Sequence, residues 1–311
     1  MKVLIADSLA PQALARLEAA GLQADDRAGI SAEELQALLP QYAGLIVRSR
    51  TKVSAALLAA APALKVVGRA GVGVDNIDLA AAKAQGVVVV NTPVSTSVAV
   101  AELTLALMLA LLRSIPRADA SMKAGAWDKK SFEGAELAGK TLGVLGMGNI
   151  GAQVARRAAA FDMRVIAYDP FLDDATITTR GALAAKLEAV YAESDVLTLH
   201  LPLLPETRGM LNESTFAQMK RGVYLICAAR GGVIDEDALL NALARGQVAG
   251  AALDVFATEP PGASALVTHP QVIATPHMGA QTAEAQTRAA ADVADEVANV
   301  LLGQPIRWQV H

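Results

Sequence analysis

A glycine-rich stretch in the middle of the chain limits the folds that this sequence can adopt. Residues 141–151 read TLGVLGMGNIG, an apolar run that leads into Gly146, Gly148 and Gly151. Between a strand and a helix, the spacing G-x-G-x-x-G brings backbone N–H groups and the positive end of a helix dipole against a pyrophosphate. Glycines also end strands for purely local reasons. The motif therefore predicts a dinucleotide site only where strands and helices surround it in a βαβ unit.

A second apolar run completes that unit. Residues 163–168 end at Asp169, which lies 18 residues after Gly151. An acid about 20 residues beyond the glycines typically bonds the adenosine ribose. Because a carboxylate there repels a 2′-phosphate, the pattern favours NAD over NADP. The alternative is that Asp169 only begins a turn before Pro170.

Length and charge narrow the class of protein. A chain of 311 residues is long enough for two domains, and its 53% hydrophobic and 4% aromatic content predicts a core of Ala, Val and Leu. A net charge of −4 with interspersed signs predicts no nucleic-acid partner. One cysteine, Cys227, excludes an intrachain disulfide and is typical of a cytoplasmic protein. Residues 98–112 are short for a membrane span and carry Glu102, so we expect a buried helix and no membrane partner.

Short apolar runs alternate with helix-forming segments along the whole chain. Before the glycine motif we expect strands over 3–6, 44–47, 64–67 and 87–90, and helices over 11–20, 54–61, 79–85, 98–112 and 116–125. After it we expect strands over 196–199, 223–227, 251–253 and 272–274, and helices over 151–160, 182–192, 212–219, 236–245 and 282–302. This alternation predicts parallel sheets covered on both faces, the second of them six-stranded.

Arginines and a glycine loop follow two neighbouring strands of the first part of the chain. Ligands of such sheets bind beyond the carboxyl ends of the strands, so these residues are candidates for holding an anionic substrate. They are Arg48, Ser49, Arg69, Gly71, Val72 and Gly73. The alternative is that each arginine is a solvated loop charge.

Three strand ends of the second part carry Arg230, Glu259 and His277. An imidazole can take a hydroxyl proton near neutral pH, and a carboxylate beside it orients the ring. A guanidinium can bind a substrate carboxylate through two parallel hydrogen bonds. The set suits the oxidation of a 2-hydroxy acid. The alternatives are a surface histidine, a loop acid and an arginine that caps its strand.

The other histidines are weaker candidates for a catalytic role. His200 ends a strand near the expected place of the ribose, where we expect a structural or backbone-mediated role, and His269 and His311 fall in a loop and at the terminus. The histidines and the cysteine show no metal-ligand spacing, so no metal site is predicted. No G-x-S-x-G nucleophile motif occurs either.

Eight segments together resemble a known family. They are IVRSRTKV, VVGRAGVGVDNID, NTPVSTSVAVAE, TLGVLGMGNIGAQVA, HLPLLPETRGMLN, AARGGVIDEDAL, GAALDVFATEPP and TPHMGAQTAEAQ. On these segments the chain resembles the D-2-hydroxyacid dehydrogenases over nearly its full length. The resemblance is closest to the members that oxidise 3-phospho-D-glycerate to 3-phosphohydroxypyruvate with NAD, in serine biosynthesis.

The resemblance also implies an architecture. It implies two doubly wound parallel-sheet α/β domains, with a Rossmann NAD-binding domain (94–282) inserted into a flavodoxin-like substrate-binding domain (1–93 and 283–311). It further implies a homodimer built on the nucleotide domain. Because the chain stops at His311, we expect it to be a short form that lacks the C-terminal regulatory domain of longer members, and with it feedback inhibition by serine.

The resemblance assigns roles to individual residues. Arg230, Glu259 and His277 would be catalytic, with His277 as general base while hydride passes from substrate C2 to nicotinamide C4. Residues 71–73 would meet the substrate carboxylate, and Arg48, Arg69 and Lys129 the distal phosphate. Asn149 and Ile150 would lie at the pyrophosphate and Asp254 near the carboxamide. The full set of expected cofactor contacts is Gly146, Gly148, Asn149, Ile150, Gly151, Asp169, His200, Leu201, Pro202, Thr207, Ala228, Ala229, Arg230, Asp254, His277, Gly279 and Ala280.

Two alternatives to this activity stay open. Another D-2-hydroxyacid dehydrogenase, such as a glyoxylate or hydroxypyruvate reductase, would work equally well on substrates without a phosphate. A binding protein of a different class, an NAD-sensing corepressor that recognises peptides, is built on the same fold and would not turn over any 2-hydroxy acid.

Overall fold

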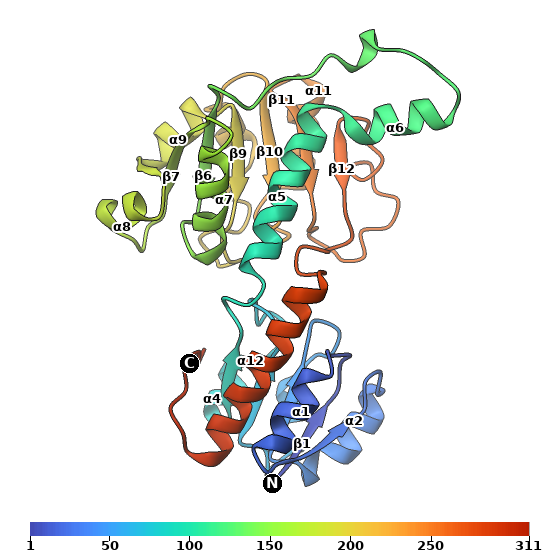
Figure 1. Cartoon of the computed structure of the whole chain (residues 1–311), viewed down its shortest axis with the longest axis vertical. Coiled ribbons are helices and arrows are strands. Elements are labelled where there is room, and N and C mark those ends of the chain that lie inside the picture. Colours follow the sequence, from blue (N-terminus) through green and yellow to red (C-terminus); the bar gives the residue numbers. More distant parts are fainter. Residues whose placement is uncertain (311) are drawn as a thin grey trace. The chain divides into compact units, whose positions relative to one another are not determined.

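The chain folds into two compact α/β units, and the computed structural model describes residues 1–310 (Figure 1). Unit 1 comprises Met1–Ser97 and Ala280–His311, and unit 2 comprises Val98–Gly279. His311, which we assigned to the substrate-binding domain, lies outside the described residues. The domain borders expected from the sequence, 93/94 and 282/283, remain a proposal.

Unit 1 is a five-stranded parallel sheet with helices on both faces. Its strands lie in the order β2-β1-β3-β4-β5, the flavodoxin-like order. The strands are β1 (Lys2–Ile5), β2 (Gln23–Asp26), β3 (Gly44–Val47), β4 (Val66–Arg69) and β5 (Val88–Asn91). The helices are α1 (Gln12–Ala19), α2 (Ala32–Leu38), the 3-10 turn η1 (Leu39–Gln41), α3 (Ala55–Ala59), α4 (Leu79–Ala84) and α12 (Ala283–Leu302).

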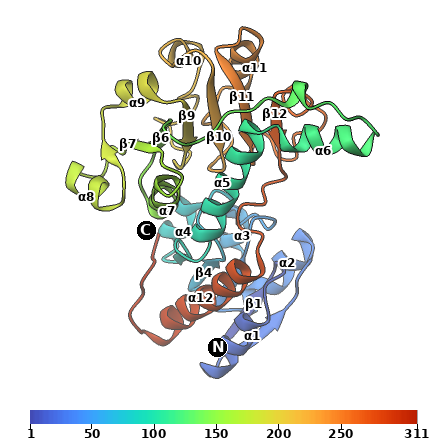
Figure 2. The same cartoon turned by 45° about the horizontal axis from the view of Figure 1, so that its top comes forward.

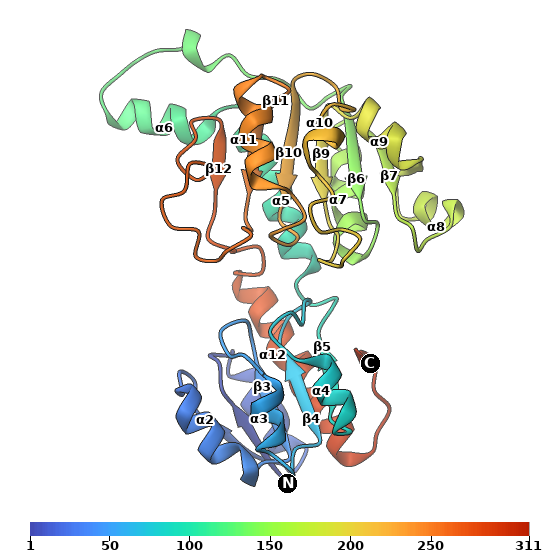
Figure 3. The ribbon, with the colours of Figure 1, turned by 180° about the vertical axis from the view of Figure 1, so that it is seen from behind.

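Alternating side chains of these strands fill two apolar cores. Val3 and Ile5 of β1 pack with α1 and α12, whereas Leu4 packs on the opposite face with α2, α3 and α4. Figure 1 shows α1 and α12 in front of this sheet, and Figure 3, from behind, shows α2, α3 and α4. Both faces are covered, which explains why β3 is apolar throughout.

Helix α12 comes from the far end of the chain to cover the unit 1 sheet. Its first turn is capped by the Thr282 side chain, which accepts a hydrogen bond from Ala285 N at 3.1 Å, and it ends at Gly303 in the left-handed region (φ +67°). Glu296 is fully buried on α12 and accepts hydrogen bonds from Arg307 Nε (2.7 Å) and Trp308 N (3.0 Å). These contacts pin the segment after α12 to the helix.

Unit 2 is a seven-stranded parallel sheet in the order β12-β11-β10-β9-β6-β7-β8. The strands are β6 (Thr141–Leu145), β7 (Arg164–Tyr168), β8 (Leu183–Ala184), β9 (Val196–Leu199), β10 (Val223–Cys227), β11 (Val248–Leu253) and β12 (Val272–Ala274). The helices are α5 (Ser97–Leu112), α6 (Ile115–Lys123), the 3-10 turn η2 (Lys130–Phe132), α7 (Asn149–Ala159), α8 (Asp174–Thr179), α9 (Leu187–Glu193), α10 (Glu213–Phe216) and α11 (Glu236–Ala244). This is the strand order of the Rossmann fold with one further strand.

The unit 2 sheet is also covered on both faces. Helices α5 and α7 pack on one face through Met108 and Val154, and α9, α10 and α11 pack on the other through Tyr191, Phe216 and Leu239. Figures 1 and 3 show these two helical layers from opposite sides. Helix α6 projects beyond the β12 edge of the sheet (Figure 2).

No single helix among residues 1–310 is long and apolar enough to cross a membrane. Only α5 and α6 taken together meet the length and composition of a span, and the two helices meet at a bend of 62°.

The structure confirms the predicted fold class and corrects several elements. The sheet of unit 2 has seven strands, not six, because residues 183 and 184 form the edge strand β8 where we expected the start of a helix. Helix α9 therefore begins at Leu187, and α8 precedes β8. In unit 1 we missed β2 and α2. The β2 sequence, QADD, lacks an apolar run because it lies at the edge of the sheet.

A close contact between β4 and α12 generates a stability prediction. A Cβ added at Gly68 would lie 2.5 Å from Val297 Cγ2 and 2.8 Å from Val293 Cγ2, whereas a Cβ added at Gly44 would lie 3.3 Å from Val297 Cγ1. We expect Gly68→Ala to destabilise the protein by about 1–3 kcal/mol through overpacking. Gly44→Ala, measured beside it by urea denaturation, is the matched control. A Gly68→Ala protein as stable as the control would contradict this packing.

Candidate active site

The glycine loop between β6 and α7 is shaped by close backbone contacts. A Cβ at Gly146 would lie 2.6 Å from the His200 carbonyl oxygen, and Gly146 itself adopts φ +91°. A Cβ at Gly151 would lie 2.1 Å from the Gly146 carbonyl oxygen, so the third glycine lets helix and strand pack together. At Gly148, in contrast, no heavy atom of the described chain lies within 4 Å of an added Cβ. The loop therefore leaves no room for a side chain at Gly146 or Gly151, whereas Gly148 is open.

These features fit a dinucleotide. Helix α7 begins at Asn149, and its N-cap, Gly148, has no side chain to cap the first turn. The backbone at the start of the helix and the helix dipole favour an anion, and the open Gly148 leaves this end accessible. The expected pyrophosphate contacts, Asn149 and Ile150, are the first two residues of this helix.

Asp169 follows β7 directly and contacts the glycine loop. Its Oδ2 accepts a hydrogen bond from Met147 N at 2.8 Å, and its Oδ1 accepts one from Phe171 N at 3.0 Å. Arg180 Nη1 donates to the carbonyl oxygen of Met147. The carboxylate expected to bind the ribose is therefore already oriented by two backbone N–H groups.

Glu259 and His277 form a hydrogen-bonded pair. His277 Nδ1 lies 2.7 Å from Glu259 Oε2, although the two residues are 18 apart in the sequence. Glu259 Oε1 accepts a second hydrogen bond, from Phe256 N at 3.1 Å. His277 adopts the left-handed region with φ +52°, a conformation that is uncommon for non-glycine residues. Both side chains remain partly exposed, at 46% for His277 and 37% for Glu259.

Asp254, at the end of β11, holds the loop that carries His277. This carboxylate is buried and accepts hydrogen bonds from Thr275 Oγ1 (2.6 Å), Met278 N (2.8 Å) and Gly279 N (2.8 Å). Both oxygens are engaged, so Asp254 holds the Thr275 side chain before His277 and the backbone directly after it. Its expected place near the carboxamide of the cofactor remains a prediction.

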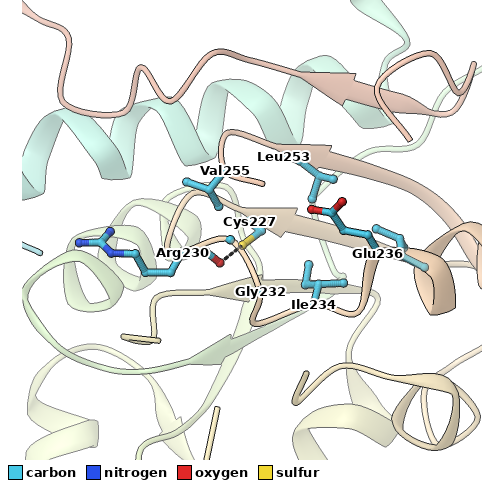
Figure 4. A pocket seen from close by; sticks show the side chains of 9 residues that line it. Cys227, Arg230, Gly232, Ile234, Glu236, Leu253 and Val255 are labelled. Atoms are coloured by element: carbon cyan, nitrogen blue, oxygen red, sulfur yellow. Dashed lines mark hydrogen bonds between the residues drawn. The ribbon is translucent and has the colours of Figure 1, made fainter. Parts of the chain in front are cut away.

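Arg230 lies in the loop after β10. Its Nη1 donates to the Ala229 carbonyl oxygen at 2.6 Å, and its own carbonyl oxygen lies 3.9 Å from Cys227 Sγ. Figure 4 shows the guanidinium turned away from the small cavity behind this loop. Burial raises the pKa of the Cys227 thiol to about 11, so Cys227 stays protonated and offers no nucleophile. Ala228 and Ala229, both buried, continue the loop.

The segment after β9 lies against the glycine loop. Leu201 Cδ2 would be 3.1 Å from a Cβ at Gly146, and Thr207 Oγ1 closes the following turn by donating to the Pro202 carbonyl oxygen at 2.6 Å. His200 Nε2 lies 3.0 Å from Thr198 Oγ1, and the buried Nδ1 of His200 has no hydrogen-bond partner among residues 1–310.

The expected substrate anchors of unit 1 lie on two firmly held loops. Buried Asp7 accepts hydrogen bonds from Arg48 N (2.6 Å), Thr51 N (3.2 Å), Thr51 Oγ1 (2.7 Å) and Arg50 Nε (2.9 Å). Asn76 Nδ2 donates to the carbonyl oxygens of Arg48 and Thr51, at 2.8 and 2.6 Å. Ser49 lies between these contacts. The loop that presents Arg48 and Ser49 is therefore fixed from both sides.

In the second loop of unit 1, the Arg69 side chain lies against Gly71. A Cβ at Gly71 would lie only 2.0 Å from Arg69 Nη1, so the guanidinium occupies the space that a side chain at 71 would need. Asn91 Nδ2 donates to the Val72 carbonyl oxygen at 2.6 Å and steadies residues 71–73. These contacts fit an anion-binding loop.

Lys129 belongs to unit 2, unlike the other expected anchors. Its Nζ lies 6.0 Å from the centre of the Trp127 ring.

Among residues 1–310 no group of three His, Cys, Asp or Glu side chains is placed to hold a metal ion.

Two supporting residues that hold the Arg48 loop, Asp7 and Asn76, escaped the sequence-based reasoning, as did Glu236, whose Oε1 accepts a hydrogen bond from Ala257 N at 2.7 Å. Asp7 directly follows an apolar strand and Glu236 opens a helix, but neither signal separates a loop-holding acid from an ordinary turn or helix-start acid. Their roles emerge only from partners distant in the sequence.

With this geometry in place, comparison with known proteins identifies the class. Residues 105–279 match the model of the D-isomer specific 2-hydroxyacid dehydrogenase family, NAD binding domain. The match covers more than half of the chain, and the chain belongs to this family of NAD-dependent oxidoreductases. NAD is accordingly the cofactor, and both the predicted family and the predicted cofactor are confirmed.

Individual relatives give a finer comparison. The chain is 50% identical over 310 residues to the D-3-phosphoglycerate dehydrogenase of Rattus norvegicus, with 100% of this chain and 58% of that protein covered. A crystal structure of a glyoxylate reductase from Paecilomyes thermophila superposes with a TM-score of 0.91 at 31% identity, covering 100% of this chain and 98% of that one. The D-lactate dehydrogenase from Aquifex aeolicus, solved with NAD and lactic acid, gives 0.84 at 30% identity, covering 97% and 96%. The chain thus spans about 58% of the length of its curated relative.

The folding stability of unit 2 depends on pH through His200. Burial lowers the pKa of His200 to about 3, so the ring is neutral in the folded protein at neutral pH. In an unfolded chain a histidine titrates near pH 6.5. As the pH falls from about 6.5 toward 3, the unfolded state therefore binds a proton that the folded state does not, and stability is lost over that window.

We expect His200→Gln to weaken this pH dependence. The free energy of unfolding of the variant should fall less steeply between about pH 6.5 and 4, by up to about 1.4 kcal/mol per pH unit. Urea denaturation across that range measures the slope, and His269→Gln is the control for removing an imidazole from unit 2. Equal slopes for wild type and His200→Gln would contradict the assignment.

Proposed function

We propose that this protein oxidises 3-phospho-D-glycerate to 3-phosphohydroxypyruvate with NAD, a step of serine biosynthesis. The observation that carries the proposal is the Glu259–His277 pair, held at 2.7 Å in the same unit as a glycine loop that fits a dinucleotide. The 50% identity to a D-3-phosphoglycerate dehydrogenase supports this substrate.

His277 acts as the general base in this proposal. Because Nδ1 is engaged by Glu259, Nε2 is the nitrogen that receives the proton of the substrate 2-hydroxyl. The Glu259 carboxylate then stabilises the imidazolium and keeps the ring oriented. When bound, NAD supplies the two-electron acceptor for oxidation at C2.

Arg230 and the unit 1 loops bind the substrate. The Arg230 guanidinium pairs with the substrate carboxylate and polarises the carbonyl that forms at C2. The backbone N–H groups of residues 71–73 are the carboxylate contacts that we propose within unit 1. Arg48, Ser49, Arg69 and Lys129 hold the distal phosphate, and the hydrogen bonds of Asp7 and Asn76 support this role by fixing the Arg48 loop.

A glyoxylate or hydroxypyruvate reductase is the second candidate. The TM-score of 0.91 with a glyoxylate reductase favours it. A panel of 2-hydroxy and 2-oxo acids, each with and without a 3-phosphate and assayed with NAD and NADP, separates the two. We expect clear preference for the phosphorylated acid and for NAD. Equal turnover without the phosphate would favour the reductase, and no turnover of any acid would favour a binding protein that senses NAD.

Arg69→Ala should remove the preference for the phosphorylated substrate. Loss of one guanidinium–phosphate contact is expected to raise KM for 3-phosphoglycerate on the order of tenfold or more, with little change for unphosphorylated acids. Arg27→Ala, which removes an exposed arginine of the same unit, is the control. A variant that keeps the wild-type preference would overturn the assignment of Arg69 as an anchor.

His277→Ala should lower kcat by about a hundredfold or more, because general-base catalysis typically contributes that much. Steady-state kinetics at saturating NAD measure the loss, and His269→Ala is the control for a histidine outside the proposed mechanism. Near-normal turnover of His277→Ala would refute the general-base role.

We also propose a cytoplasmic homodimer assembled through unit 2. Exposed apolar side chains on and after α6 support an interface there: Ile115 is 52% exposed, Met122 53% and Trp127 75%. The single cysteine suits a reducing compartment. Sedimentation equilibrium of the wild type and of Met122→Glu tests the dimer, and a monomeric wild type would refute it.

A further inference from the structure

A small cavity lies behind the two loops that carry Arg230 and Glu259. It is lined by residues from the end of β10, the start of α11 and the end of β11, among them Cys227, Arg230, Glu236 and Val255 (Figure 4). In Figure 4 the Arg230 side chain points away from the cavity, whereas the Glu236 carboxylate turns toward the β11 side. Glu236 has no role in the chemistry proposed above.

The two loops approach so closely that a side chain cannot fit between them. A Cβ at Gly231 would lie 1.8 Å from the Phe256 carbonyl oxygen and 2.8 Å from Ala257 N. The backbone of residues 256–257 is therefore pressed against the loop of Arg230. Any movement of that backbone changes the position of Glu259, only two residues further along.

Two glutamates accept hydrogen bonds from this backbone. Phe256 N donates to Glu259 Oε1 at 3.1 Å, and Ala257 N donates to Glu236 Oε1 at 2.7 Å. The other oxygen of Glu259 bonds His277 Nδ1 at 2.7 Å. A continuous series of contacts thus runs from Glu236 through the 256–257 backbone to Glu259 and His277.

We propose that Glu236 is a positioning residue for the Glu259–His277 pair, a role that rests on the function proposed for that pair. Without an acceptor at 236, the Ala257 N–H, which lies in an exposed part of the loop, exchanges a fixed carboxylate for mobile water. The turn then relaxes, and Glu259 no longer fixes the imidazole. Displacements of about 1 Å in a catalytic group can cost on the order of a hundredfold in rate.

Helix α11 offers a matched set of variants. Glu236→Met keeps the size of the side chain but removes the acceptor, whereas Glu236→Gln keeps a carbonyl oxygen that can accept from Ala257 N. Asp237 lies in the same first turn and is exposed, so Asp237→Asn removes one acidic charge from the helix start without touching the loop. The set separates hydrogen bonding to Ala257 from the interaction of an acid with the helix dipole.

Kinetics provide the first measurement. We expect Glu236→Met to lower kcat by tenfold to a hundredfold while its NAD dissociation constant, measured by calorimetry, stays within about twofold of wild type. Glu236→Gln and Asp237→Asn should keep kcat within about threefold. Wild-type kcat in Glu236→Met, or an equal loss in Glu236→Gln, would overturn the proposal.

The ring nitrogens of His277 provide a second measurement that needs no turnover. Long-range ¹H–¹⁵N spectra of the full chain, labelled at histidine, report which nitrogen carries the proton, and His277→Gln identifies the signals. A carboxylate on Nδ1 favours the Nδ1–H tautomer. We expect this tautomer in wild type, Glu236→Gln and Asp237→Asn, and a mixture of tautomers in Glu236→Met.

The two measurements distinguish the two proposals. A wild type that turns over no 2-hydroxy acid would defeat the proposed function, yet the spectra would still report whether Glu236 fixes His277. An unchanged His277 tautomer in a folded Glu236→Met protein would defeat the positioning role, whatever the activity.

Discussion

The parallel arrangement of the strands is the constraint on which the candidate site depends. In unit 2 all seven strands run the same way, so their carboxyl ends meet at one edge of the sheet. The glycine loop, Asp169, Arg230, Glu259 and His277 each follow one of these ends. A sheet with mixed directions would separate groups that the chain places more than a hundred residues apart.

Carboxylates that accept hydrogen bonds from backbone N–H groups fix the loops that follow these strands. Asp254 fixes the backbone directly after His277, Asp169 orients the glycine loop, and Asp7 fixes the Arg48 loop in unit 1. Charge-assisted hydrogen bonds of this kind are stronger than neutral ones. Each holds its loop before a ligand arrives, which lowers the entropic cost of assembling a site.

How well the sequence predicted each feature depends on how far apart in the chain the interacting residues lie. The glycine loop, the apolar strands and the parallel fold class have local signatures, and Asp169 after the second strand of the glycine unit favoured NAD. Strands β2 and β8 were missed because they are edge strands without a full apolar run, so their pairing depends on neighbours rather than on composition. The contact of Glu236 with Ala257 spans 21 residues and has no local pattern, and the 2.7 Å separation of Glu259 and His277 likewise appears only in the fold.

The position of α12 in the sequence has a consequence for synthesis. The sheet of unit 1 is complete by Asn91, but the helix that covers one of its faces starts at Ala283. That apolar face cannot be buried by α12 while the ribosome is still making unit 2, whose residues 98–279 are contiguous. Unit 2 can therefore reach its native core first, reversing the usual order in which amino-terminal domains fold earliest. Until α12 emerges, only α1 covers that face of the sheet, and chaperones can recognise the apolar surface that stays open.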